Sequence, residues 1–437
     1  MPRVRFLPER PPRPTGRTSA SLWRRLGAVG VIAGLVAAAG VAAAGALAAC
    51  GAGRAASAPA AATTDSPPAV SAAQAEQAMA SFNRVFCTNA LGGRFYKKST
   101  DGALADFWKE AEMTETAEDY YDLTHAAQYK DLVNSLCRGI YGRYGSDWMS
   151  IYSAVTHQRL GPRANDDIMW MVIAMARAYR VTGQTAYRTW AKQNFDRAYA
   201  RAWSTDFGGG LWWRSARIRP QKNTTTNAPA AIAACELARD FGASSTQGRA
   251  YIAQAKSLYR WLRGHLFDAR TGQVYDSVSY APDYSVIVNR LRFTYNQGSF
   301  IGAAELLHEI TGAPVYLDDA QRAMTFTRDH LTTNGILQND ADHADQDAGG
   351  FKGVFARWAL RFVRENRITS FTVWLERNAT VAWAHRNASG LVGYDWSVCA
   401  KGPTTSTTSG TPTHPLYSFD CSSAVAMMEI GLLNLAQ

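Results

Sequence analysis

Two adjacent aspartates, Asp166 and Asp167, follow Asn165 where an apolar stretch with helical periodicity begins. Cleavage of a glycosidic bond requires two carboxyl groups, one ionised and one protonated. At a helix start the backbone amides favour an ionised carboxylate, whose charge would raise the pKa of its neighbour. The same residues also suit an ordinary helix N-terminus, because Asn caps helices and acids favour the first turn. Spacing alone leaves both interpretations open.

A glycine run at 208–210 leads into Trp212 and Trp213. Glycine lets a backbone approach a ligand closely, and indole rings can stack on the faces of sugars. The alternative is a flexible loop that its tryptophans anchor to the core. Asn223 and Asn227 follow at the next helix start, where they could cap the helix or bind sugar hydroxyls.

Another polar cluster, Tyr295, Asn296 and Gln297, stands at a later helix start. Such a cluster supplies the fixed donors and acceptors that hydroxyl-rich ligands require, although Asn296 could merely cap. An acidic loop then precedes a lysine, and we expect a solvated loop from which Asp347 or Lys352 reaches a groove. The loop lacks the glycine and terminal glutamate of an EF-hand. No Cys/His cluster has zinc-ligand spacing, so we expect no metal and no cofactor.

The N-terminal segment has the pattern of an export signal. Residues 1–25 contain seven arginines and one acid, so most of the net charge of +10 lies there and gives no argument for nucleic acid. An uncharged apolar run follows over 28–49, for which an uncleaved membrane anchor is the alternative. The run ends in Leu-Ala-Ala-Cys at Cys50, which resembles the bacterial lipobox. We expect 1–49 to be removed, Cys50 to carry lipid on the outer face of the cell membrane, and 50–72 to be a disordered tether.

Export implies an oxidising compartment. Cys399 and Cys421 bracket a Thr/Ser/Pro-rich loop, which predicts a disulfide between them. A second disulfide could join Cys87 to Cys137, and Cys235 fits a buried free thiol in a helix.

The domain that positions these residues, 73–437, is predicted to be all-α. Weakly repeated helix endings at Gly183 and Gly312 pair the helices into hairpins. Long loops between hairpins should gather on one face, where function usually lies. Six hairpins predict an (α/α)6 barrel, and no persuasive strand pattern competes with it. The predicted helices are 72–91, 105–124, 126–143, 166–182, 185–202, 224–241, 246–265, 296–311, 316–331, 350–365, 369–388 and 420–436.

Taken together, these segments resemble glycoside hydrolase family 76, the endo-α-1,6-mannanases. The matching stretches, in family order, are Phe107-Trp108 through Thr124, Asn165-Asp166-Asp167 through Gly183, Gly208 through Trp213, Lys222-Asn223 through Asn227, Val274-Tyr275-Asp276, Thr294 through Gly298, and Phe351 through Phe355. The resemblance implies an (α/α)6 barrel, α-1,6-mannan as substrate and retention of anomeric configuration. It also implies Asp166 as nucleophile and Asp167 as acid/base. Ala228-Pro229 and the C-terminal cysteine loop depart from the family pattern.

Three other functions compete with hydrolysis by a monomeric mannanase. In transglycosylation a sugar hydroxyl replaces water and uses the same residues, so the sequence does not separate the two reactions. A non-catalytic glycan-binding toroid would be expected to lack one of the aspartates, and both are present. A zinc-dependent cyclase toroid would need a Cys/His ligand set. Whether the polymer is envelope mannan glycolipid or foreign mannan is left open.

Overall fold

The computed structural model describes residues 69–100, 102–152, 158–214, 220–344, 347–399 and 415–433. The predicted export signal, Cys50 and nearly all of the tether lie outside these residues. Contacts divide the chain into Met1–Ala46 and Leu47–Gln437, and every described residue belongs to the second unit. None of the described helices combines the length and the apolar character needed to cross a membrane.

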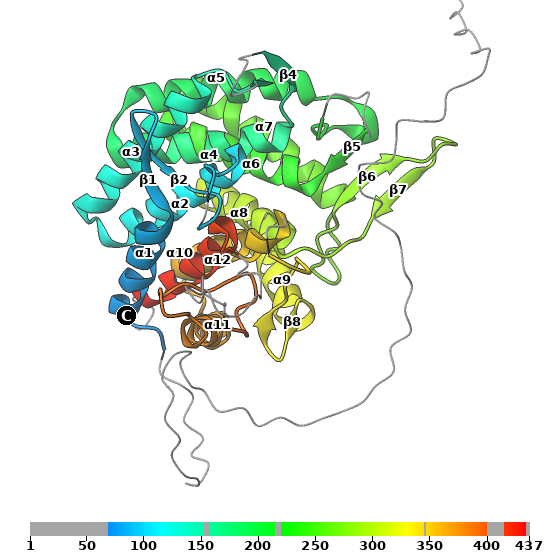
Figure 1. Ribbon diagram of the computed structural model, residues 1–437. Coiled ribbons are helices and arrows are strands. Elements are labelled where there is room, and N and C mark those ends of the chain that lie inside the picture. Colours follow the sequence, from blue (N-terminus) through cyan, green and yellow to red (C-terminus); the bar gives the residue numbers. More distant parts are fainter. Residues whose placement is uncertain are drawn as a thin grey trace, which may run out of the picture. The chain divides into compact units, whose positions relative to one another are not determined.

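Twelve α-helices occur in the described residues, and each corresponds to a predicted helix (Figure 1). They are α1 (Ala72–Phe86), α2 (Phe107–Thr124), α3 (Ala127–Tyr144), α4 (Asn165–Thr182), α5 (Thr185–Ala202), α6 (Thr224–Asp240), α7 (Thr246–His265), α8 (Thr294–Thr311), α9 (Pro314–His330), α10 (Phe351–Glu365), α11 (Thr372–Ala384) and α12 (Ser418–Met428).

The even-numbered helices form a closed inner ring. Each packs against the next, from α2 through α4, α6, α8, α10 and α12 back to α2, and the odd-numbered helices pack outside them. Sequence explains the layers, because a helix that is apolar all round must be buried. Helix α4 is buried continuously from Ile168 to Ala178, whereas α5 buries only one side. The predicted (α/α)6 barrel is confirmed.

Nine short strands accompany the helices in the described residues, and the sequence analysis did not predict them. They form three two-stranded sheets and one three-stranded sheet of order β5-β6-β7, all antiparallel. With two to four residues each, they are too short for an alternating pattern to be seen. The strands are β1 (Cys87–Ala90), β2 (Gly93–Tyr96), β3 (Ser150–Tyr152), β4 (Arg159–Pro162), β5 (Gln221–Asn223), β6 (Ser277–Tyr280), β7 (Val286–Asn289), β8 (Thr332–Thr333) and β9 (Ile336–Leu337).

The first predicted helix, 72–91, is too long, because α1 ends at Phe86 and the chain turns into the β1–β2 hairpin. Two glycines let this hairpin lie directly on α3. A Cβ at Gly93 would stand 2.2 Å from the Ser135 carbonyl oxygen, and one at Gly139 would stand 1.9 Å from that of Arg94. The tertiary contact of the hairpin therefore replaces the last turn of the expected helix.

Both predicted disulfides are wrong. Cys87, Cys137 and Cys421 carry free thiols, as does Cys235. Strand β2, and not β1 with its Cys87, lies against α3, where Cys137 is enclosed by the core. Cys421 is enclosed within the first turns of α12 and carries a free thiol, so it is not bonded to Cys399.

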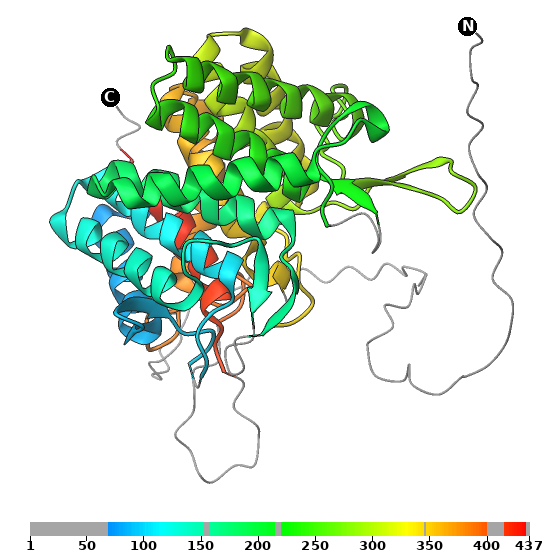
Figure 2. The same cartoon turned by 90° about the horizontal axis from the view of Figure 1, so that it is seen from above.

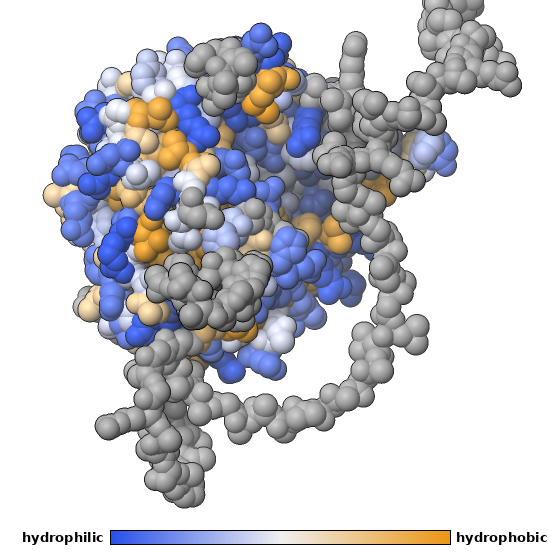
Figure 3. All heavy atoms as spheres, in the orientation of Figure 1, coloured by the Kyte–Doolittle hydropathy of each residue, from blue (hydrophilic) through white to orange (hydrophobic). Residues whose placement is uncertain are grey.

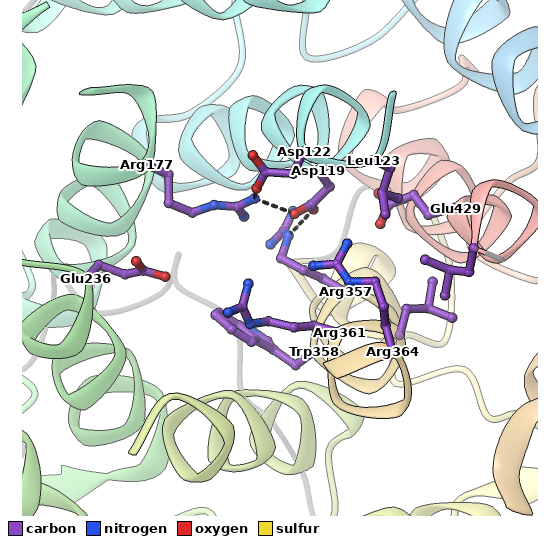
Figure 4. Close-up of a pocket in the computed structure, with 12 residues that line it drawn as sticks. Asp119, Asp122, Leu123, Arg177, Glu236, Arg357, Trp358, Arg361, Arg364 and Glu429 are labelled. Carbon is purple, nitrogen blue, oxygen red and sulfur yellow. Dashed lines mark hydrogen bonds and ion pairs between the residues drawn. The ribbon is translucent and has the colours of Figure 1, made fainter. Parts of the chain in front are cut away.

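A buried ionic network joins three inner helices (Figure 4). Arg177 of α4 donates to Asp119 of α2 at 2.6 Å, and the Nε of Arg357 of α10 donates to the same carboxylate at 2.7 Å. Arg177 follows Asp166 by eleven residues on α4, which is about 16 Å along the helix axis. The network therefore belongs to the end of the barrel away from the aspartate pair. Although Asp119 is buried, the two guanidinium groups lower its pKa.

Candidate active site

A cleft of about 300 Å³ contains both predicted catalytic residues. The first turns of α2, α4, α6, α8 and α10 all contribute to it, so it lies at the N-terminal ends of the inner helices. These ends carry partial positive charge from unpaired amides. The cleft is lined by Trp108, Ala164, Asp166, Asp167, Trp170, Trp213, Arg214, Gln221, Asn223, Thr225, Asp276, Tyr295, Asp347, Phe351 and Val354.

Asp166 is held by the glycine-rich loop. Its Oδ2 accepts the indole N–H of Trp213 at 2.8 Å, while Oδ1 is buried and has no protein hydrogen-bond partner. The backbone N–H of Asn165 donates to the Trp213 carbonyl at 2.9 Å, and the Asn165 side chain donates to the Trp212 carbonyl at 2.7 Å. Asn165 thus fastens the loop to the helix start instead of capping α4, whose N-cap is Ala164.

The pKa values of both aspartates are raised. Burial is the main cause for Asp166, the charge of Asp167 adds to it, and the Trp213 hydrogen bond opposes it. Burial also raises the pKa of Asp167 to about 6, against the opposing charges of Arg163 and Arg214. The pair therefore holds one proton over a range of pH, since the second carboxyl does not ionise readily beside the first.

Asp347 faces the pair from the 3₁₀ turn η2 (Asp347–Gly350), and its charge helps to raise the pKa of Asp167. The ammonium group of Lys109, a buried residue of α2, lies 2.8 Å from the Asp347 carboxylate. This ion pair fixes the turn against α2. The sequence analysis had not singled out Lys109, because a lysine in a helix is usually solvated.

Asp276 is a further carboxylate of the cleft, at the entry to β6. It accepts hydrogen bonds from Ser277 at 3.0 Å and from Asn289 at 3.1 Å, and the Asn296 amide lies 3.3 Å away. Burial raises its pKa despite these donors. Asp276 stood in one of the matching segments but was not chosen as a site residue.

Four of the predicted substrate-binding residues line the cleft: Trp213, Asn223, Tyr295 and Asp347. Five do not: Trp212, Asn227, Asn296, Gln297 and Lys352. Trp108, Trp170, Arg214 and Phe351 line it although the sequence analysis did not choose them as site residues. Trp108, Trp170 and Phe351 stood in matching segments, which was a usable signal.

Burial explains most of these absences. Both ends of the Asn227 amide bond to the Leu211 backbone, at 2.7 and 3.0 Å. The Gln297 amide accepts from the Val274 N–H at 2.7 Å, and Lys352 donates to Asn339 at 2.7 Å. We correct the prediction accordingly, and assign these side chains to the scaffold that holds the loops.

The part of the chain that the structure describes contains no group of three or more His, Cys, Asp or Glu side chains arranged to hold a metal ion. The cleft instead offers two paired carboxyls, indole and phenyl rings, and amide or hydroxyl groups. Such a site can transfer protons, stabilise a cationic transition state and bind a hydroxyl-rich ring.

Two groups of known proteins are similar to the chain. Among curated relatives, mannan endo-1,6-alpha-mannosidase DCW1 of Candida glabrata is 29% identical over 255 residues, which is 54% of each chain. Mannan endo-1,6-alpha-mannosidase DFG5 of Candida albicans is 23% identical over 265 residues, 57% of each. The chain spans about half the length of the curated relatives that it matches.

Among solved structures, an alpha-1,6-mannanase of Salegentibacter sp. matches with a TM-score of 0.68 and 27% identity over 82% of this chain and 98% of that one. An inactive variant of that enzyme, with two consecutive aspartates replaced by asparagine, was solved in complex with alpha-1,6-mannotriose.

The family model described as glycosyl hydrolase family 76 matches residues 70–416, which include every element that lines the cleft. The chain belongs to glycosyl hydrolase family 76.

Proposed function

We propose that this protein is a retaining glycoside hydrolase that cleaves α-1,6-mannosidic bonds in mannan. The observation that carries the proposal is the buried pair Asp166 and Asp167 in a cleft at the positive ends of five helices. The two aspartates whose replacement inactivates the Salegentibacter enzyme are likewise consecutive, and that enzyme binds α-1,6-mannotriose. By analogy we assign the same substrate class to this cleft.

The contacts of each carboxyl suggest its role. Asp166 accepts a fixed N–H from Trp213, and a hydrogen bond of this kind favours the ionised form. We assign Asp166 as the nucleophile that forms the mannosyl-enzyme. The pair retains one proton while Asp166 is ionised, and on this assignment Asp167 carries it, gives it to the leaving oxygen and takes one back from water. We assign Asp167 as the acid/base.

The remaining groups of the cleft would bind the sugar rings. Trp108, Trp170 and Trp213 offer flat faces, while Asn223 and Asp276 offer hydrogen-bonding groups for hydroxyls. The N-terminal amides of the inner helices would favour the ionised aspartate between them.

We further propose that the protein is an exported lipoprotein that acts as a monomer. Support comes from the arginine-rich segment, the apolar run and the lipobox-like sequence ending at Cys50. Lipid on Cys50 would hold the barrel on the outer face of the cell membrane through the tether 50–72.

The test is product sizing after incubation with linear α-1,6-mannan. Short α-1,6-manno-oligosaccharides with retained configuration, and their absence with Asp166→Ala, are expected. Products longer than the substrate would mean transglycosylation. No change in chain length would refute a catalytic role for the cleft.

A further inference from the structure

The β6–β7 hairpin extends away from the helices in both views (Figures 1 and 2). Its base belongs to the cleft, because Asn289 at the end of β7 donates to Asp276 at 3.1 Å and Asp276 lines the cleft. Strand β5 pairs with β6 beside this base, with Gln221 opposite Ser279. The hairpin therefore begins at the edge of the cleft that contains Asp166 and Asp167.

The far half of the hairpin exposes apolar side chains on both faces. Tyr280 pairs with Val286 on one face, and Ile287 pairs with Ser279 on the other. Tyr284 is 82% exposed, Val286 57% and Ile287 47%. Single exposed apolar residues are ordinary, but a contiguous group on a projecting element marks an interaction site. Elsewhere, the face shown in Figure 3 is mostly hydrophilic, with hydrophobic residues in small groups.

The hairpin is braced where β6 ends, at Tyr280. Phe207 of the glycine-rich loop stacks on Tyr280 with ring centroids 4.2 Å apart, and it also meets Trp212 edge-on at 5.9 Å. Phe207 adopts a left-handed backbone with φ of 53°, which a residue of this type rarely does. The loop that holds Asp166 thus also supports the hairpin.

The base of the hairpin, and not its tip, carries the positive charge that suits an anionic lipid surface. Between Tyr280 and Asn289 the single charged residue is Asp283, which accepts from its neighbour Ser285. Exposed Arg290 and Arg292 follow at the base. With about 3.3 Å per residue, Arg290 lies about 10 Å from Ile287. Apolar side chains at a membrane interface are buried to a depth of about 5–10 Å. At that depth of Ile287, the two arginines would lie at the level of the anionic headgroups.

We propose that the hairpin tip inserts into an anionic lipid surface and so presents the cleft to mannan chains anchored in that surface. The substrate part of this proposal rests on the proposed function. Val286 and Ile287 favour hydrocarbon over sugar, because sugar sites use flat rings and hydrogen-bonding groups. The competing occupant is a second copy of the chain, paired along β7, which is an edge strand.

The experiment uses the domain from residue 69 to 437, so that the apolar run at 28–49 does not itself bind lipid. The similar Salegentibacter structure consists almost entirely of this domain, because the match covers 98% of that chain. Co-sedimentation with phosphatidylcholine vesicles, with and without phosphatidylglycerol, compares the wild type, the double variant Val286→Ser/Ile287→Ser and the control Val373→Ser. Val373 is 75% exposed on α11.

We expect the wild type and Val373→Ser to bind the phosphatidylglycerol vesicles. The double variant should bind them with an affinity that is lower by about tenfold or more. All three should hydrolyse soluble linear α-1,6-mannan equally. If none hydrolyses it, the proposed function fails while the vesicle result still stands. No vesicle binding by the wild type, or equal binding by the double variant, would overturn the proposal. A different result would also overturn it. If light scattering shows that the wild type is a dimer and the double variant a monomer, and neither binds vesicles, then β7 pairs with a second copy.

Discussion

Trp213 connects the glycine-rich loop to the chemistry through one hydrogen bond to Asp166. Trp213→Phe keeps a ring in the cleft but removes the donor, so the pKa of Asp166 should rise further. A hydrogen bond to a charged group contributes about 1.5–3 kcal/mol, so kcat/KM on linear mannan should fall about tenfold or more. The acid limb of its pH profile should also move to higher pH. Trp212→Phe is the matched control, because Trp212 lies outside the cleft, and it should leave the limb in place.

The variants Asp166→Ala and Asp167→Ala should lose activity in different ways. Asp167→Ala removes the proton donor and should cost about 10²–10⁴-fold on mannan, and less on an activated aryl mannoside that needs little protonation. Added azide should then rescue this variant and give the α-mannosyl azide. Asp166→Ala should lose turnover on every substrate, and azide should give only the β-azide. A β-azide from Asp167→Ala would show that the roles are exchanged.

The pH dependence of kcat/KM should be bell-shaped. The doubly protonated pair lacks a nucleophile, and the fully ionised pair lacks an acid. The two titrations belong to the pair and not to either residue alone, and burial raises both pKa values. Activity should therefore rise as the first carboxyl of the pair ionises, near pH 6, and fall at higher pH as the second ionises. Asp167→Asn, assayed on an aryl mannoside, should lose the alkaline limb. A profile that is flat from pH 4 to 9 would contradict the coupled pair.

At the scale of elements, α2 is unusual because its buried face is acidic. Glu118 is completely buried and neither of its carboxylate oxygens has a hydrogen-bond partner, although Arg177 lies 3.6 Å away. Burial raises its pKa well above the ordinary value. A carboxyl with a raised folded-state pKa stabilises the fold fully below its unfolded pKa, and this contribution is lost as pH rises toward the folded value.

Glu118→Gln removes that titration. The variant should therefore gain in free energy of unfolding relative to the wild type as pH rises from about 4 to 8. Urea unfolding at several pH values measures the difference, and Glu376→Gln on the outer helix α11 serves as control. A constant difference between Glu118→Gln and wild type across this range would show that Glu118 is ionised in the folded protein.

At the scale of the whole molecule, the N-terminal segment decides where the barrel works. If Cys50 is lipidated, mass spectrometry of the native protein should find an acylated N-terminal peptide that begins at Cys50. Cys50→Ser should leave the precursor uncleaved. An unmodified Cys50 thiol, or an intact Met1, would contradict the anchor and leave the catalytic proposal untouched.

The sequence by itself determined the helices and pointed to Asp166 and Asp167 as the candidate pair. Apolar residues at helical spacing and glycines at helix ends are local signals, so twelve helices could be predicted from contiguous residues. Alternation of short turns and long loops then indicated one functional face. The local segment around Asn165 left a helix-start role open for Asp166 and Asp167, and the ordered set of segments that resembles the family favoured a catalytic role for them.

Only the tertiary structure decided which polar side chains reach the cleft. Tyr295 lines it whereas Gln297, two residues later on α8, is enclosed by the backbone near Val274. Asn223 lines it whereas Asn227 bonds to Leu211. Neighbouring positions on a helix point in different directions, and loops far away in sequence determine what each one meets. The cysteine pairings failed for the same reason, since a disulfide depends on a distance between residues that no local pattern records.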